Sequence, residues 1–235
     1  MSQIELIRAE KTALADYHIR GVLFDMDGLI LDTEKLYTRF WQEAAHCLGY
    51  PMTKEQALGI RSTNHQIAAA RIKSYFGPDT PYEEIRNKRI ELMEAFIDKE
   101  GVEAKPGIHE LLAYLKAHGI PTCIATSSPL ERVQKYLSFV RLEDCFDQIV
   151  TAYMVKKGKP EPDIYLCAAS QLGLAPRDCL ALEDSPSGLI AAYRAGCLPV
   201  MIPDQDQPDE EIRKLLFARV DRLDLVIQLL EQIKS

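Results

Sequence analysis

Short apolar runs that resemble buried strands alternate with helix-like segments over most of this chain. Apolar side chains at helical spacing follow each run, and most of the helix-like segments end at a glycine. This order is typical of βαβ units, in which parallel strands form one sheet with helices on both faces. We therefore expect an α/β fold with a doubly wound parallel sheet. Its strands are predicted at residues 20–26, 120–125, 148–150, 179–182 and 198–202, and its helices at 107–118, from about 129, 162–172, 186–195, near 209–217 and 223–233.

Residues 34–101 interrupt this alternation directly after the first strand. Apolar residues recur at helical spacing there, and no convincing strand lies between Leu31 and Gly101. The economical interpretation is an all-α helical domain inserted into the α/β domain. We expect an α/β core formed by residues 1–30 and 105–235 and a helical domain formed by 31–104, with helices at 34–48, 63–76 and 81–100.

The overall composition limits the possible partners. The chain has 235 residues, of which 47% are hydrophobic, enough for one large or two modest domains. It contains 28 Lys and Arg against 35 Asp and Glu, a net charge of −7. Because it also lacks a dense run of basic residues, we expect no nucleic acid partner. No apolar stretch reaches the roughly 18 residues that span a bilayer, and the N-terminal residues lack the basic-then-apolar pattern of a signal peptide. We expect a cytoplasmic protein with no membrane partner, whose residues 2–16 form either a short helix or a loose arm.

The six cysteines are scattered, without a Cys-x-x-Cys pair, and are predicted to be buried apolar thiols in a reducing compartment. The five histidines are also scattered, and none has the spacing of zinc ligands.

The first predicted strand ends at two carboxylates, Asp25 and Asp27, and is followed by Gly28. One carboxylate can attack phosphorus as a nucleophile, and an acid two residues later can protonate the leaving oxygen and then activate water. A glycine lets the backbone N–H groups of Met26 and Gly28 approach phosphoryl oxygens. The spacing therefore predicts Asp25 and Asp27 as catalytic residues.

Two later segments carry groups that suit a phosphate. Thr126 and Ser127 follow a predicted strand, where hydroxyl and N–H groups can bind a phosphate oxygen or cap the next helix. Lys159 stands in Gly-Lys-Pro-Glu-Pro-Asp, where two prolines make a rigid lead-in to a helix. A positioned ammonium can neutralise a nucleophile and the developing phosphoryl charge, although a single lysine before a helix can also be an ordinary surface residue.

A further predicted strand ends at the acids Glu183 and Asp184. Mg²⁺ prefers oxygen ligands and keeps several waters. Asp25, the backbone carbonyl of Asp27, Asp184 and, through water, Glu183 would provide such ligands. The sequence therefore predicts a magnesium site, because the carboxyl ends of parallel strands meet at one edge of a sheet.

These four segments, in this order, resemble the four motifs of the haloacid dehalogenase superfamily. Residues 25–34, Asp-Met-Asp-Gly-Leu-Ile-Leu-Asp-Thr-Glu, are similar to its beta-phosphoglucomutase-like branch, in which a helical cap follows the first motif. Segments 158–163 and 183–188 are similar to its Gly-Lys-Pro-x-Pro-Asp and Glu-Asp-Ser-x-x-Gly signatures. The branch includes phosphatases of sugar, glycerol and pseudouridine phosphates.

The resemblance implies a magnesium-dependent enzyme with an aspartyl-phosphate intermediate. Asp25 would be the nucleophile and Asp27 the acid and base, Thr126 and Lys159 would bind phosphate, and Asp184 would bind Mg²⁺. Asp27 favours phosphoryl transfer, because the dehalogenases of the superfamily lack that second acid.

Two activities of this branch remain open, phosphatase and phosphosugar mutase. The mutases typically have a histidine where this chain has Tyr37, and Asp-Thr-Glu at 32–34 is more similar to the phosphatases. We therefore expect hydrolysis, with a mutase as the alternative, and a non-catalytic binding module on the same fold as a further one.

The substrate is expected to be a small phosphorylated metabolite, such as a sugar, polyol or nucleoside phosphate. Arg61 lies where the mutases have an arginine in the cap, so Arg61 and the nearby Asn64 are predicted to contact the substrate, although both equally fit an ordinary surface. The oligomeric state is open, and we expect a monomer.

Overall fold

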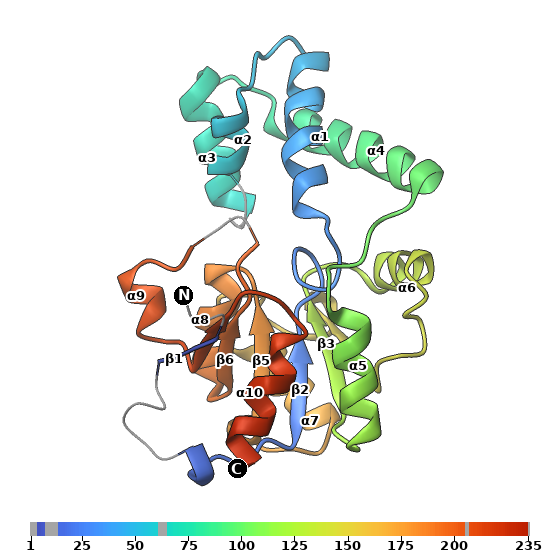
Figure 1. Ribbon diagram of the computed structural model, residues 1–235. Helices are drawn as coiled ribbons and strands as arrows, with labels where there is room; N and C mark the ends of the chain where they lie inside the picture. The colour runs from blue at the N-terminus through green and yellow to red at the C-terminus, as the bar shows by residue number, and fades with distance from the viewer. Residues whose placement is uncertain (1–3, 8–13, 61–64, 205–206, 235) are drawn as a thin grey trace. The chain divides into compact units, whose positions relative to one another are not determined.

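The computed structural model describes residues 4–7, 14–60, 65–204 and 207–234 of the chain. It forms two compact units, one of Met1–Leu31 with Glu103–Ser235 and one of Asp32–Val102 (Figure 1). The first unit is an α/β domain, whereas the described residues of the second form helices and loops.

The described strands of the α/β unit form one sheet with the order β1-β7-β6-β5-β2-β3-β4. β1 pairs antiparallel with β7, and the other neighbours are parallel. This topology confirms the predicted α/β class and places β2, which precedes Asp25, between β5 and β3. The strands are β1 (Ile4–Leu6), β2 (Gly21–Phe24), β3 (Thr122–Thr126), β4 (Gln148–Thr151), β5 (Cys179–Glu183), β6 (Leu198–Met201) and β7 (Ala218–Val220).

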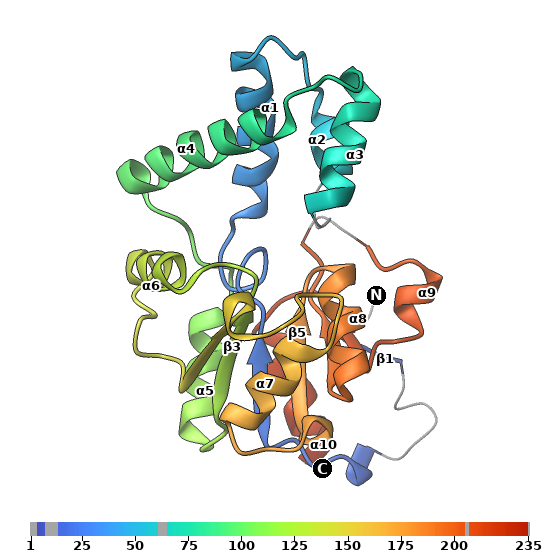
Figure 2. The same cartoon turned by 180° about the vertical axis from the view of Figure 1, so that it is seen from behind.

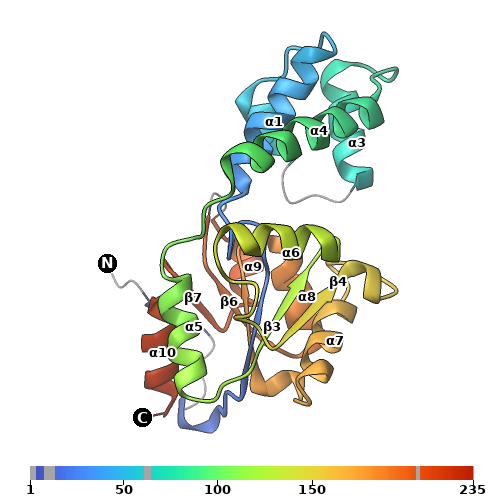
Figure 3. The same cartoon turned by 90° about the vertical axis from the view of Figure 1, so that its right-hand side faces the viewer.

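Helices cover both faces of this sheet. α5 (Ile108–Ala117) and α10 (Leu225–Lys234) lie on one face, and α7 (Asp163–Gln171) and α8 (Pro186–Ala195) lie on the other (Figure 2 and Figure 3). The central strands are therefore buried on both sides, which explains why their sequences are continuous apolar runs. A bilayer crossing would need a longer and more apolar helix than any that the described residues form. The unit also contains α6 (Leu130–Phe139), α9 (Glu210–Arg213) and 3-10 turns at Leu14–Asp16, Ala152–Met154 and Pro176–Asp178.

The helical unit packs around aromatic residues. The ring of Trp41 stacks on that of Tyr82 with 6.1 Å between centroids, and Phe40 lies 5.4 Å from Phe96. Phe40 and Trp41 thus form part of the interior of the helical unit, as their spacing indicates. Its helices are α1 (Glu34–Cys47), α2 (Lys54–Gly59), α3 (His65–Phe76) and α4 (Tyr82–Glu100).

Four local predictions differ from the structure. Residues 4–6 form the edge strand β1, and not a helix or arm. β7 and the short helix α2 were not predicted, and the helix expected near 209–217 ends at Arg213. A strand of three residues is too short to show a two-residue period in its sequence, and its pairing depends on residues distant in the chain. Directly before β7, for example, the Phe217 N–H donates to Pro199 O at 2.7 Å. Leu216 and Phe217 are buried in the core, so the chain straightens there into β7.

The prediction for the cysteines was correct only for some of them. Cys123, Cys179 and Cys197 are buried, and burial raises the pKa of the Cys123 thiol to about 12. Cys47 and Cys145 are exposed, contrary to the prediction. All six are free thiols.

The fully buried Leu23 gives a test of the central packing. It lies in the middle of β2 in a cluster with Cys123, Ile164 and Ala168. We predict that Leu23→Ala lowers the free energy of unfolding by about 2–5 kcal/mol, because it removes buried methyl groups and leaves a cavity. Leu166→Ala on α7, where the side chain is 44% exposed, should cost less than about 1 kcal/mol. Urea unfolding followed by circular dichroism checks both values, and equal losses would show that Leu23 is not a core residue.

Candidate active site

The register of the sheet brings Asp25 next to Glu183. Phe24 of β2 lies opposite Leu182 of β5, so the residues that follow them, Asp25 and Glu183, are neighbours at the carboxyl edge of the sheet. The backbone N–H of Asp25 donates to Leu182 O at 3.0 Å, which continues the pairing by one residue. Two acids distant in sequence thus meet because two buried apolar strands pair in parallel.

The chain leaves β2 in a tight loop. The N–H groups of Ile30 and Leu31 both donate to Met26 O, at 3.0 and 3.1 Å, and that of Gly28 donates to Leu31 O at 2.9 Å. Gly28 has a φ of +86°, which a side chain would strain. The Gly28 N–H, which was predicted to bind phosphate, here closes the loop that directs Asp25 and Asp27.

Lys159 bridges two of the acids. Its Nζ lies 2.5 Å from Asp25 Oδ1 and 2.6 Å from Glu183 Oε1. The side chains of Lys159, Asp25 and Glu183 are only 7%, 11% and 0% exposed. An ammonium and carboxylates removed from water to this extent need each other, since an isolated buried charge is very costly. The structure thus brings together three residues that sequence reasoning selected from three separate segments.

Glu183 receives hydrogen bonds on both carboxylate oxygens. Its Oε1 also accepts from the Tyr165 hydroxyl at 2.5 Å, and its Oε2 accepts from the Ser185 hydroxyl at 3.0 Å. A Cβ atom on Gly188 would lie 1.8 Å from Glu183 Oε1, so only glycine allows α8 to begin this close to the carboxylate. These contacts hold Glu183 in place beside Lys159, which it supports. The sequence predicted Glu183 only as a ligand of the metal through water, and not this role.

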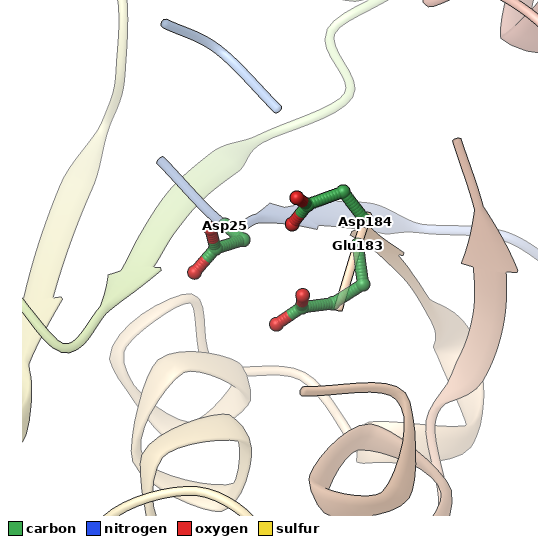
Figure 4. Close-up of side chains that lie close together, drawn as sticks. All are labelled: Asp25, Glu183 and Asp184. Atoms are coloured by element: carbon green, nitrogen blue, oxygen red, sulfur yellow. The ribbon is translucent and has the colours of Figure 1, made fainter. Parts of the chain in front are cut away.

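Asp184 completes a cluster of acids with Asp25 and Glu183. One oxygen from each of the three carboxyl groups lies within 4.8 Å of the others, and all three residues are buried (Figure 4). Figure 4 shows Asp25 at the end of β2 and the other two at the end of β5, with the side chains of Glu183 and Asp184 extending toward the side where Asp25 lies. Lys159 brings one positive charge to three carboxyl groups. An all-oxygen donor set with this surplus of negative charge fits a hard divalent cation such as Mg²⁺.

Asp27 lies outside that cluster and contacts the loop after β3. The Ser128 hydroxyl donates to Asp27 Oδ2 at 2.9 Å, and the backbone N–H of Ser128 donates to the Thr126 hydroxyl oxygen at 3.1 Å. Thr126 is buried, whereas the neighbouring Ser127 is exposed. The loop that was predicted to bind phosphate is therefore also the one that orients the second acid.

The electrostatics of the site depend on burial. Burial raises the pKa of Asp25 to about 7, although the Lys159 ammonium acts in the opposite direction. Burial also disfavours the charge on Lys159, but the carboxylates of Asp25 and Glu183 outweigh this and raise the pKa of Lys159 above its usual value. Lys159 therefore keeps its positive charge, and the charge of Asp25 responds to pH near neutrality.

Sequence reasoning missed Tyr165 and Ser128 as partners of site residues. Ser128 could have been found, since it continues the hydroxyl run of Thr126 and Ser127. Tyr165 could not, because an aromatic residue on the apolar face of a helix is usually only part of the core. Arg61 and Asn64, the predicted substrate contacts, lie outside the described residues.

Comparisons with known proteins identify the family of the chain. Residues 22–202 match the family model described as haloacid dehalogenase-like hydrolase. The chain is 34% identical over 219 residues to "Hexitol phosphatase A" of Escherichia coli strain K12, covering 91% of this chain and 93% of that protein. It is 38% identical over 191 residues to "Probable pseudouridine-5'-phosphatase" of Drosophila melanogaster, covering 77% and 80%. It is also 31% identical over 196 residues to "Beta-phosphoglucomutase" of Bacillus subtilis strain 168, covering 81% and 85%.

A solved structure supports the fold. The crystal structure of a HAD hydrolase, family IA, variant 3, from Entamoeba histolytica matches with a TM-score of 0.78 and 27% identity, over 92% of this chain and 100% of that one. The family model matches well over half of the chain and includes every acid of the site. The chain therefore belongs to the haloacid dehalogenase-like hydrolase family.

Proposed function

We propose that this protein is a magnesium-dependent phosphatase that hydrolyses a small phosphorylated metabolite through an aspartyl-phosphate intermediate. The relatives named as phosphatases support phosphoric monoester hydrolysis as the activity. The observation that carries the finer proposal is the buried Lys159 ammonium, which contacts Asp25 at 2.5 Å beside the acidic cluster. A carboxylate held by a fixed cation is suited to attack a phosphate, whose own negative charge would otherwise repel it.

In the first half of the reaction, an oxygen of Asp25 attacks phosphorus, and the bond between phosphorus and the leaving oxygen breaks. Asp27 donates a proton to that leaving oxygen. The Ser128 hydroxyl, which donates to Asp27 Oδ2 at 2.9 Å, orients this acid for the proton transfer. Lys159 and the hydroxyl of Thr126 stabilise the charge on the transferring phosphoryl oxygens, together with Ser127 and the backbone N–H of Met26.

In the second half, Asp27 takes a proton from water, and the water oxygen attacks the phosphorus of the intermediate. The bond between phosphorus and Asp25 breaks, which releases inorganic phosphate and restores both carboxyl groups. The same acid thus gives a proton in one step and takes one in the next, so an aspartate that stays close to the phosphoryl group is needed throughout.

Asp25 and Asp184, with the backbone carbonyl of Asp27 and with Glu183 through water, are the residues that would hold Mg²⁺. When bound, the cation adds positive charge beside the transferring phosphoryl group. The contacts of Glu183 with Lys159 and Tyr165 restrict Glu183 to an indirect part in binding the metal.

Hydrolysis is proposed over the mutase reaction. Tyr37 stands where the mutases typically have a histidine, and Asp-Thr-Glu at 32–34 is similar to the phosphatases. The two reactions differ in their products, since a mutase leaves its product phosphorylated and depends on a bisphosphate activator.

The substrate class follows from the relatives and remains broad. Hexitol, sugar and nucleoside phosphates are the substrates to test, with Arg61 and Asn64 of the helical unit as the proposed contacts. We propose a cytoplasmic setting and a monomer, which the six free thiols and the acidic net charge of −7 suit.

We predict that Asp25→Asn lowers phosphate release by about a thousandfold or more, because the amide is neither charged nor nucleophilic. The assay measures inorganic phosphate from a panel of phosphorylated metabolites with and without MgCl2. Asp144→Asn, at an exposed acid of the same unit, is the matched control and should keep the wild-type rate. Substantial turnover by Asp25→Asn with its circular dichroism unchanged would exclude Asp25 as the nucleophile, and a product that stays phosphorylated would favour the mutase.

The pKa of Asp25 leads to a second prediction, about the metal. With a pKa of about 7 in the metal-free protein, Asp25 is mostly protonated at about pH 5.5 and mostly ionised at about pH 8. As the pH falls, the cation must displace this proton in order to bind. MgCl2 should therefore raise the melting temperature more at about pH 8 than at about pH 5.5, and the effect should shrink in Asp184→Asn. An equal stabilisation at both pH values would argue against binding of Mg²⁺ at Asp25.

A further inference from the structure

Tyr165 is a buried residue of α7 that contacts the site but has no part in the reaction described so far. It is fully buried, and its hydroxyl lies 2.5 Å from Glu183 Oε1. Its ring centroid lies 5.2 Å from Lys159 Nζ. Tyr165 therefore touches both the ammonium that faces Asp25 and the carboxylate that holds this ammonium from the other side.

Tyr165 and Lys159 donate to the same oxygen. Glu183 Oε1 accepts from Lys159 Nζ at 2.6 Å and from the Tyr165 hydroxyl at 2.5 Å. A carboxylate oxygen with two donors directs less of its charge to each of them. The hydroxyl thus weakens the attraction of Glu183 for the ammonium. If the Tyr165 hydroxyl were removed, Lys159 would no longer share Glu183 Oε1 with it. The ammonium would then be drawn toward Glu183 and away from Asp25.

The ring of Tyr165 also restricts the position of the Lys159 ammonium. A cation within about 6 Å of an aromatic face is attracted to it, and more strongly where water is excluded, as it is here. Lys159 is consequently held between Asp25, Glu183 and the ring. A cation fixed in this way is pre-organised for a phosphoryl group and loses little entropy when that group arrives.

The position of Tyr165 follows from α7. Ile164, Tyr165, Ala168 and Ala169 form the buried face of this helix, in the same cluster as Leu23 of β2. This packing fixes the ring, so the hydroxyl has a single direction relative to the end of β5. Burial, and then the negative charge of Glu183 and Asp25, raise the pKa of Tyr165 well above its usual value, so the hydroxyl remains protonated and is the donor.

We propose that Tyr165 is a positioning residue for Lys159: by sharing Glu183 Oε1 and by placing its ring beside the ammonium, it keeps Lys159 directed at Asp25 and at the phosphoryl group of the substrate. The proposal deepens the proposed function and rests on it for the role of Lys159. It also accounts for the hydroxyl of Tyr165, which a purely structural core residue would not need.

Tyr165→Phe tests the proposal, because it keeps the ring and removes only the hydroxyl. We expect kcat/KM for phosphate release to fall about tenfold and the inhibition constant of inorganic phosphate to rise by a similar factor. The melting temperature should change little. Tyr17→Phe is the matched control, since Tyr17 precedes β2 at the opposite edge of the sheet and packs on Phe217. This control should keep both kinetic constants.

A crystal structure of Tyr165→Phe without substrate gives a readout that is independent of turnover. We expect the contact between Lys159 and Glu183 to persist and the contact between Lys159 and Asp25 to lengthen or break. A second measurement introduces Tyr165→Phe into a Glu183→Gln background, where it should change phosphate inhibition less than about twofold, since the shared charge is already gone.

The outcomes separate this inference from the proposed function. If the wild type releases phosphate, but Tyr165→Phe matches it in kinetics and in the position of Lys159, the positioning role is overturned. If Lys159 moves as expected but the wild type hydrolyses no phosphorylated metabolite, the positioning holds and the proposed function fails. Equal losses in the Glu183→Gln and wild-type backgrounds would show that Tyr165 does not act through Glu183.

Discussion

The ammonium of Lys159, buried between Asp25 and Glu183, is the interaction on which the site depends. Its Nζ lies 2.5 and 2.6 Å from the two carboxylates, in surroundings where an unpaired charge could not persist. Three parts of the fold meet to make it: the parallel pairing of β2 with β5, the lead-in to α7 that carries Lys159, and the glycine that lets α8 begin against Glu183. Removing one partner would leave the others as uncompensated buried charges, so the site and the fold around it depend on each other.

The same interaction would allow the proposed site to bind both a cation and a phosphate. One ammonium offsets part of the charge of the acids Asp25, Glu183 and Asp184, and the remainder suits a divalent ion. Hydrogen bonds from Tyr165 and Ser185 fix the position of the Glu183 carboxylate, and burial raises the pKa of Asp25 to about 7. A cation held between a fixed anion and the proposed nucleophile would form a pre-organised environment for phosphoryl transfer.

The predictable parts of this protein are those that local patterns encode. The ends of β2 and β5 can be located in the sequence because the apolar runs up to Phe24 and Leu182 stop abruptly at acids. The alternation of strands and helices places these ends at one edge of a sheet. β1 and β7 escaped prediction because a three-residue strand is defined by its distant partner. Tyr165 escaped because its sequence context is that of a core residue, and only the coordinates reveal that its hydroxyl reaches Glu183. The roles of Arg61 and Asn64 remain predictions.

Chemical trapping of the phosphoenzyme tests the central claim most directly. The protein is mixed with substrate and MgCl2, quenched in acid and treated with borohydride, which reduces an aspartyl-phosphate to homoserine, and its peptides are then analysed by mass spectrometry. The account predicts homoserine at position 25, formed only when substrate is present. Modification at another residue, or none under conditions of rapid turnover, would contradict the assignment of Asp25 as the nucleophile that Lys159 holds in place.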